Sequence, residues 1–301
     1  MQLEAVTKRY GKEEALRAVS FTMDTGTIGL LGPNGAGKST LIKVLLGLLH
    51  FDGQALVFGL DPRVKPAQVR SRVGYMPEGE CYLAGMTAID LCTYAGELSG
   101  LPRTEAMDRA HQALGYVGLG DKRYQKVDGY STGMKQKVKL AQAIVHDPDL
   151  LLLDEPTAGL DPRGREEMLQ LIADIPRKRG GAMVLSSHLL ADIESVCEQV
   201  IVLSRGELRF AGLLAELRAG EMGTYLVRIK GEPEAFLRAL AAAGCEARPG
   251  DDGALRVRLP AGGDTSAILR AAVSAGVQVR RLEAERRTLE AAFLQAVGGH
   301  A

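Results

Sequence analysis

The sequence predicts a mostly parallel α/β core that carries a helical insertion and is followed by a small α+β domain. Three patterns predict this organisation. A glycine-rich loop lies between a strand-like run and an apolar helix, a later apolar run of strand length ends in two acidic residues, and short strand and helix patterns alternate after about residue 220. The 301 residues, 46% hydrophobic and 25% charged, suffice for one large and one small domain.

The glycine-rich loop fits the phosphate-binding pattern G-x-x-x-x-G-K-[ST], with a strand expected at residues 27–31 and a helix at 41–49. Its backbone N–H groups can wrap phosphates, its lysine can reach the terminal phosphates, and its serine can bind Mg²⁺. A turn that merely caps a helix is the alternative, but the flanking elements favour binding of a nucleoside triphosphate. The loop consists of Gly32, Pro33, Asn34, Gly35, Ala36, Gly37, Lys38, Ser39 and Thr40.

The later apolar run, residues 150–153, ends in Asp154 and Glu155. Parallel strands place their carboxyl ends at the functional edge of a sheet, so both carboxylates are expected there. Asp154 suits Mg²⁺, directly or through water, and Glu155 is placed to take a proton from an attacking water. A strand followed by an acidic turn would explain the same residues, since Pro156 ends the strand in any case. The phosphate-binding loop favours the catalytic interpretation.

A helix is expected from Ser131 to about residue 146, with Ser131 as its N-cap and apolar residues at helical spacing. Its start also resembles the signature motif of ABC ATPases, which precedes the acidic strand end in that family. The family's motifs occur in order over roughly residues 1–212. This resemblance implies a P-loop NTPase core with a helical subdomain of ABC ATPase type, and hydrolysis of ATP. The signature segment is Tyr130, Ser131, Thr132, Gly133, Met134, Lys135 and Gln136.

The resemblance assigns roles to residues that would not stand out alone. Tyr10 corresponds to the aromatic residue that stacks on adenine, although a partly exposed strand tyrosine is the simpler interpretation. Glu78 corresponds to the residue that contacts Mg²⁺ and the attacking water. His188 corresponds to the histidine that touches the γ-phosphate, although a histidine after a strand is more often structural. Lys38, Glu155 and His188 then form the expected catalytic set.

Three further residues are implied to act across a subunit interface. Ser131 and Gly133 are expected to face the nucleotide of an opposite subunit, and Asp161 lies in the loop that contacts that subunit. Asp161 could equally cap the helix expected at residues 163–178. The resemblance thus implies an ATP-dependent dimer, which is expected to be a homodimer.

Two departures from the commonest family pattern concern the site. Glu78 stands where most members have glutamine, and Thr132 and Met134 replace a glycine and a glutamine of the signature. A carboxylate can still bind Mg²⁺ or water, and Gly133 with the helix N-terminus can still approach a phosphate. Both variants resemble those of ATPases that serve exporters of the ABC-2 type.

Periodicity predicts further elements of the core. One helix of the insertion, within residues 86–146, is expected to run from a Thr104 cap to a Gly118 stop. Strands are expected to return at Leu150, Ala182 and Val200. The expected buried face of the helix is Ala106, Ala110, Ala113, Leu114 and Val117.

The ATPase domain is expected to span residues 1–219 and an accessory domain residues 220–301. The accessory domain resembles a ferredoxin-like domain in its order of elements, contains no recognisable catalytic set, and could serve regulation, assembly or structure alone. The expected order is a strand at 225–230, a helix at 232–243, two short strands around Asp251, Asp252 and Gly253, a helix at 264–275, a strand at 277–282 and a helix to about 297.

Charge and cysteine content narrow the partners and the compartment. The 37 basic and 37 acidic side chains give no basic excess, so a nucleic-acid partner is not indicated. The cysteines, at positions 81, 92, 197 and 245, lack metal-site or disulfide spacing, which favours buried thiols in the cytoplasm. No targeting or membrane-spanning run is evident, so a transport pathway would be a separate polytopic permease, with this chain peripheral on the cytoplasmic face. Residues 79–85 could contact that permease or be a plain surface loop.

Two functional classes share this ATP chemistry. The expected one is the ATP-hydrolysing subunit of a membrane exporter. The alternative is an ABC ATPase without a permease that remodels nucleic acid, ribosomes or an assembly scaffold. DNA-repair members of that class carry a long coiled-coil insertion between the positions of Lys38 and Ser131, and translation members carry two ATPase cassettes. This sequence shows neither feature, and co-purification of a polytopic membrane protein would discriminate the two classes.

Overall fold

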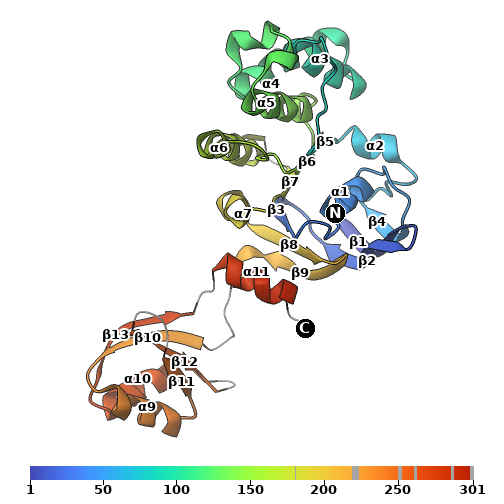
Figure 1. Cartoon of the computed structure of the whole chain (residues 1–301). Helices are drawn as coiled ribbons and strands as arrows, with labels where there is room; N and C mark the ends of the chain where they lie inside the picture. The colour runs from blue at the N-terminus through green and yellow to red at the C-terminus, as the bar shows by residue number, and fades with distance from the viewer. Residues whose placement is uncertain (180, 219–223, 250–252, 261–262, 286–287, 299–301) are drawn as a thin grey trace. The chain divides into compact units, whose positions relative to one another are not determined.

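The computed structural model describes residues 1–179, 181–218, 224–249, 253–260, 263–285 and 288–298. Its internal contacts divide the chain into two compact units, and Figure 1 labels most of their elements. The first unit comprises Met1–Leu214 together with the residues from Phe293 onward, and the second comprises Ala215–Ala292. The boundary predicted between residues 219 and 220 lies outside the described residues and stays a prediction.

A six-stranded sheet in the order β5-β6-β7-β3-β8-β9 forms the centre of the first unit. The pairs from β5 to β8 are parallel, whereas β9 pairs with β8 in the antiparallel sense. The predicted strands at 27–31 and near Leu150, Ala182 and Val200 are confirmed, but β9 was not predicted because its half-exposed side chains form no apolar run. The strands are β3 (Gly26–Leu31), β5 (Val73–Met76), β6 (Leu150–Asp154), β7 (Ala182–Ser186), β8 (Gln199–Ser204) and β9 (Glu207–Leu213).

Helices cover both faces of this sheet. On one face, Ile28 and Leu30 of β3 pack in the same core as the apolar residues of α1 (Lys38–Leu45). On the other face, Gly29 lies against Ile193 of α7 (Leu190–Val196), so closely that a Cβ on Gly29 would come within 2.3 Å of the Ile193 side chain. Because both faces are covered, all five residues of β6 are buried, which explains its continuous apolar run.

A second, three-stranded antiparallel sheet has the order β2-β1-β4. Its strands are β1 (Gln2–Tyr10), β2 (Glu13–Thr22) and β4 (Asp52–Leu56). Sequence alternation did not predict this sheet because register shifts interrupt both strand pairs, and Ala5 and Ala18 adopt positive φ values at these irregularities. Leu3 and Val6 of β1 join the core around α1, so this helix is enclosed between the two sheets.

Helix α1 is shorter and begins earlier than the helix predicted at residues 41–49. It begins at Lys38 because Gly37 provides a left-handed N-cap, with φ of 104°. It ends at Leu45 because Gly47 is also left-handed, with φ of 65°, and the backbone N–H of Leu48 donates to the carbonyl of Lys43. The apolar periodicity of the sequence continues beyond Leu45 and therefore did not reveal the end of the helix.

The helical insertion contains α3 (Ala88–Leu98), α4 (Arg103–Tyr116) and α5 (Thr132–Ile144), which Figure 1 shows grouped together. The predicted buried face of α4 is confirmed, as is its end at Gly118, which is left-handed with φ of 74°. The predicted cap at Thr104 was wrong, since the helix begins at Arg103 directly after Pro102, and proline suits a helix start. The helix predicted from Ser131 is confirmed as α5.

The first unit contains further helices outside this insertion. The helix predicted at residues 163–178 is observed as α6 (Pro162–Arg179). Three short helices were not predicted, because each is too short to show helical periodicity: α2 (Pro66–Arg70), α7 and α8 (Leu214–Arg218).

The second unit has the predicted order of strands and helices, and its four strands pair antiparallel in the order β11-β12-β10-β13. Its core combines Val227 and Val257 of the sheet with Phe236 and Ile268 of the two helices. The predicted turn at Asp251 and Asp252 lies outside the described residues. The elements are β10 (Thr224–Lys230), α9 (Pro233–Ala242), β11 (Glu246–Pro249), β12 (Leu255–Arg258), α10 (Ser266–Ser274) and β13 (Gln278–Ala284).

The last helix, α11 (Leu289–Gly298), gives a prediction about stability because the residues from Phe293 onward belong to the first unit. We expect a chain that ends at residue 292 to lose the partial burial of Phe293 and Val297, worth about 1–3 kcal/mol. The melting temperature of the first unit, measured by calorimetry, should fall by several degrees. A chain that ends at residue 298 is the control, and an equal melting temperature for both truncations would contradict the assignment.

Candidate functional site

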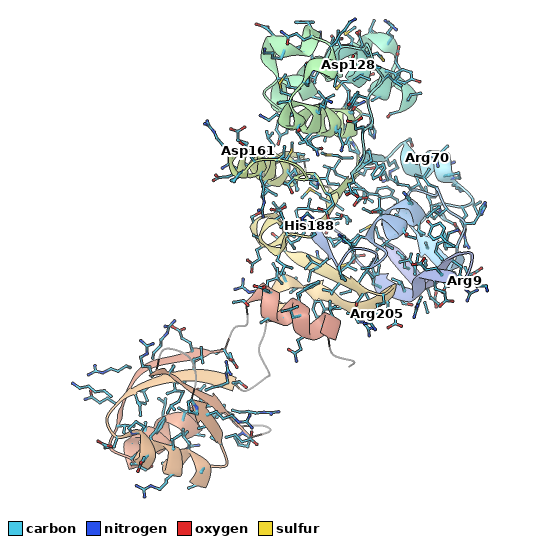
Figure 2. All side chains as sticks on the ribbon, viewed as in Figure 1. Arg9, Arg70, Asp128, Asp161, His188 and Arg205 are labelled. Atoms are coloured by element: carbon cyan, nitrogen blue, oxygen red, sulfur yellow. The ribbon has the colours of Figure 1, made fainter. Side chains whose placement is uncertain are left out.

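A pocket of about 560 Å³ lies at the carboxyl edge of the six-stranded sheet. The four neighbouring strands β5, β6, β7 and β3 all run in the same direction, so the segments that follow them meet at this edge. Figure 2 labels His188, which follows β7, in this part of the first unit. The lining residues are Tyr10, Glu13, Ala15, Asn34, Gly35, Ala36, Gly37, Lys38, Ser39, Thr40, Glu78, Asp154, Glu155, Ala158 and His188.

The glycine-rich loop connects β3 to α1 and requires its glycines for two reasons. Gly35 and Gly37 have φ values of 78° and 104°, which ordinary side chains rarely adopt. A Cβ on Gly37 would also come within 2.5 Å of the carbonyl oxygen of Ala15. The loop can therefore turn tightly into the N-terminus of α1, where unpaired N–H groups and the helix dipole favour an anion.

Lys38 points back across the loop from the first turn of α1. Its Nζ donates to the carbonyl oxygen of Gly32 at 2.7 Å and lies 3.4 Å from that of Pro33, and the residue is 8% exposed. These two predicted residues thus hold the lysine and do not themselves line the pocket. A buried ammonium group with neutral carbonyl partners is well placed to exchange them for phosphate oxygens, which accept a stronger hydrogen bond.

Asp154 ends β6 and is buried, with 3% exposure. Its Oδ1 accepts a hydrogen bond from the hydroxyl of Ser186 at 2.7 Å, and the two residues are paired in the register of β6 and β7. This bond fixes the orientation of the carboxylate. Ser186 was not predicted as a site residue, because its position opposite Asp154 depends on the strand register.

Glu155 and His188 are joined directly, since Oε2 of Glu155 lies 2.7 Å from Nδ1 of His188. Glu155 is buried with a φ of 51°, an uncommon conformation for a residue with a side chain, and its backbone N–H donates to the carbonyl of Ser186. His188 is about half exposed, with 54% of its side chain accessible. The histidine can therefore contact a ligand in the pocket while it orients the carboxylate.

Glu78 reaches the pocket from the segment after β5, and Tyr10 from the end of β1. The carbonyl of Glu78 accepts a hydrogen bond of 2.9 Å from Nζ of Lys139, a buried residue of α5. Burial lowers the pKa of Lys139, and nearby acidic groups oppose that effect. Tyr10 is 47% exposed, so its ring is accessible to a flat ligand, with Nζ of Lys8 5.1 Å from the ring centroid.

Three further predicted residues, in addition to Gly32 and Pro33, do not line this pocket, namely Ser131, Gly133 and Asp161. Ser131 caps α5 by accepting from the N–H of Met134, and Asp161 accepts from the N–H of Gly164 at the start of α6, so its capping role is observed. No described residue requires glycine at position 133, because a Cβ there would make only an ordinary contact of 3.7 Å. Figure 2 labels Asp161 at the start of α6.

Sequence reasoning also missed Asp192, which is fully buried in the first turn of α7. Its carboxylate accepts from the hydroxyls of Thr157 at 2.7 Å and Ser187 at 3.1 Å, and pairs with Arg165 of α6 at 2.5 Å. It thereby connects the segment after Glu155 to the segment before His188. The sequence contains no signal for this role, because α7 was not predicted and the partners of Asp192 come from separate segments of the chain.

These features define a P-loop nucleoside triphosphatase with an acidic residue and a histidine at adjacent strand ends. The ABC transporter family model matches residues 16–158. The uncharacterised ABC transporter ATP-binding protein YxlF of Bacillus subtilis is 37% identical over 243 residues, which cover 79% of each chain. The Nod factor export ATP-binding protein I of Burkholderia lata is 34% identical over 235 residues, which cover 77% of each chain.

A solved structure of an ATP-binding subunit of an ABC transporter is 30% identical and superposes with a TM-score of 0.65, covering 72% of this chain and 91% of the other. The chain therefore belongs to the ATP-binding proteins of ABC transporters. It binds ATP, and its enzymatic activity is ATP hydrolysis. Within the described part of the chain, no helix is both long and apolar enough to cross a membrane.

The geometry of Lys38 gives a prediction about affinity. We expect Lys38→Ala to raise the dissociation constant for ATP by about tenfold or more, because a charge-assisted hydrogen bond contributes about 1.5–3 kcal/mol and the pocket contains no other lysine. Isothermal titration calorimetry measures this change. Lys43→Ala is the matched control, since Lys43 is exposed on the same helix and lies outside the pocket. Equal affinities for the two variants would mean that the loop lysine is structural.

Proposed function

We propose that the chain is the ATP-hydrolysing subunit of a membrane exporter and couples ATP binding, closure of a dimer and hydrolysis to transport by a separate permease. It would act on the cytoplasmic face of the membrane. The observation that carries the ATPase part is the pocket that unites the glycine-rich loop with Glu78, Asp154, Glu155 and His188. Export is supported by the relative named for Nod factor export and by the resemblance of the Glu78 and signature variants to those of ABC-2 exporters.

In this proposal the loop N–H groups and Lys38 bind the phosphates of ATP, and Tyr10 stacks on the adenine. Glu155 accepts a proton from a water molecule as the water oxygen bonds to the γ-phosphorus and the bond to the bridging oxygen breaks. His188 holds the Glu155 carboxylate in position through the 2.7 Å contact and lies where it can also contact the γ-phosphate. The remaining charge stabilisation comes from the helix N-terminus.

The donor set of the pocket fits Mg²⁺, because Ser39, Glu78 and Asp154 offer oxygen ligands and all line it. Among the described residues, no three acidic, histidine or cysteine side chains converge closely enough to hold a metal by themselves. Magnesium would therefore take other ligands from the nucleotide and from water. When bound it neutralises charge on the phosphate oxygens.

Ser131, Gly133 and Asp161 are proposed to contact the nucleotide of a second subunit. Their absence from the pocket supports this role, and so does the open space around Gly133, where no described residue comes close enough to require glycine. A helix N-terminus without a bulky side chain can approach a phosphate closely. A complete site would then need two copies.

The permease contact is proposed at a second pocket of about 520 Å³, which lies beside the segment that carries Glu78. Its lining includes Cys81 and two leucines that are unusually exposed, Leu48 at 53% and Leu98 at 70%. An amphipathic segment of a membrane protein could bury both leucines there. Its proximity to Glu78 would connect transport to the nucleotide.

The proposed roles predict the behaviour of Glu155→Gln. We expect this variant to bind ATP with an affinity within about threefold of the original, because the amide keeps the shape of the side chain. Hydrolysis should fall by about 10² or more, since the amide cannot accept the proton. Light scattering should show a dimer in the presence of ATP and Mg²⁺ and a monomer without them, because each closed site needs residues of both subunits.

Unchanged hydrolysis in Glu155→Gln would remove Glu155 from the proposed role. A monomer at saturating ATP and Mg²⁺ would contradict the composite site. Gly133→Asp in the Glu155→Gln background tests the interface directly, because it places a negative side chain where a phosphate is expected.

The exporter proposal predicts a membrane partner. We expect a polytopic membrane protein to co-purify with the chain from detergent-solubilised membranes. The double variant Leu48→Glu, Leu98→Glu should abolish this co-purification and keep the ATPase activity of the isolated chain. Val273→Glu is the matched control, because Val273 is an apolar residue with 81% exposure in the second unit. Recovery of nucleic acid or ribosomes in place of a membrane protein would favour the remodelling alternative.

A further inference from the structure

One face of α5 contacts the segment that carries Glu78 at three points. Lys135, Lys139 and Gln142 follow each other at spacings of four and three residues, so they lie on the same face of the helix. Nζ of Lys139 donates to the carbonyl of Glu78 at 2.9 Å, Nζ of Lys135 donates to the hydroxyl of Tyr82 at 2.8 Å, and Sγ of Cys81 lies 3.7 Å from Oε1 of Gln142. These three α5 residues are called the α5 polar stripe below.

Among the residues of the α5 polar stripe, Lys139 has a charged group whose burial carries a desolvation cost. It is 5% exposed, and lysine is rarely this buried unless an anion pairs with it. Its hydrogen-bond partner is a main-chain carbonyl, which compensates a buried charge less well than a carboxylate does. The lysine therefore contributes something other than packing.

The segment that receives these contacts has little support of its own. Strand β5 ends at Met76 and α3 begins at Ala88, and the residues between them form no helix and no paired strand apart from a single bridge at Thr87. Glu78 is itself exposed. The position of its carboxylate thus depends on what holds its main chain, and Lys139 supplies a direct bond to that main chain.

We propose that Lys139 is a positioning residue for Glu78, which it holds in the pocket and links to the helix that carries Ser131 and Gly133 at its N-terminus. The Lys139 ammonium fixes the Glu78 carbonyl to α5, and Lys135 fixes Tyr82 at the other end of the segment. Movement of α5 when its N-terminus engages the opposite subunit is then transmitted to Glu78. This inference rests on the proposed role of Glu78 in binding Mg²⁺ and water.

The full-length variant Lys139→Met tests the inference, because methionine keeps much of the volume and removes the donor. We expect kcat for ATP hydrolysis to fall by about tenfold or more, since small misplacements of a positioned group are costly. The KM for ATP should change by less than about threefold, because the loop and Lys38 are untouched. The Mg²⁺ concentration for half-maximal rate should rise, and Lys139→Arg should restore part of the rate.

Lys137→Met is the matched control on the same helix. Lys137 is partly exposed and pairs with Glu167 of α6 at 3.2 Å, so it makes a comparable polar contact that does not involve the Glu78 segment. We expect its kcat and Mg²⁺ dependence to stay near the original values. Tyr82→Phe is a second test, because it removes the hydroxyl that accepts from Lys135 and leaves α5 unchanged. We expect it to lower kcat by about twofold to threefold.

The outcomes separate this inference from the proposed function. If Glu78→Ala impairs hydrolysis while Lys139→Met and Tyr82→Phe keep the original kcat and Mg²⁺ dependence, the positioning role is wrong and the role of Glu78 stands. If Glu78→Ala leaves hydrolysis unchanged, the proposed role of Glu78 and the positioning role of Lys139 are both wrong. A Lys139→Met protein that loses ATP affinity and melting temperature together with kcat, without rescue by arginine, would show a structural role only and also overturn the inference.

Discussion

The parallel pairing of β5, β6, β7 and β3 is the constraint on which the nucleotide site depends. It brings the ends of four strands that are distant in sequence to one edge of the sheet, and the segments that follow them supply Glu78, Glu155, His188 and the glycine-rich loop. Helices α1 and α7 cover the two faces of the sheet. A shift of β6 by one residue would turn Asp154 away from Ser186.

Buried polar contacts then hold the loops that the sheet alone leaves free. Asp192 connects Thr157, Ser187 and Arg165, and Lys139 holds the main chain of Glu78. Such groups carry a desolvation cost, and removal of one partner leaves the others unsatisfied. The segments at the strand ends are therefore tied by polar contacts to α5, α6 and α7, so movement of these helices would reach the pocket.

The sequence could predict those parts of the fold and site whose chemistry needs particular residues close together. The glycine-rich loop, the acidic end of β6 and the buried face of α4 are of this kind, and their structural context is confirmed. Contacts between residues that are distant in sequence leave no local pattern. The bond between Lys139 and Glu78, which lie 61 positions apart, is an example. Register shifts in β1 and the half-exposed side chains of β9 similarly disrupted the alternation that predicts strands. Helix boundaries depended on left-handed glycines such as Gly47, which apolar periodicity does not reveal.

The left-handed backbone of Glu155 has a consequence for how this protein can change. A φ of 51° costs a residue with a side chain about 1 kcal/mol or more, whereas glycine adopts it without strain. For this backbone conformation, glycine would therefore be more favourable than glutamate at position 155, but glycine has no carboxylate. In the proposed mechanism stability and catalysis oppose each other at this position, because the residue with the strained backbone is the one that accepts the proton.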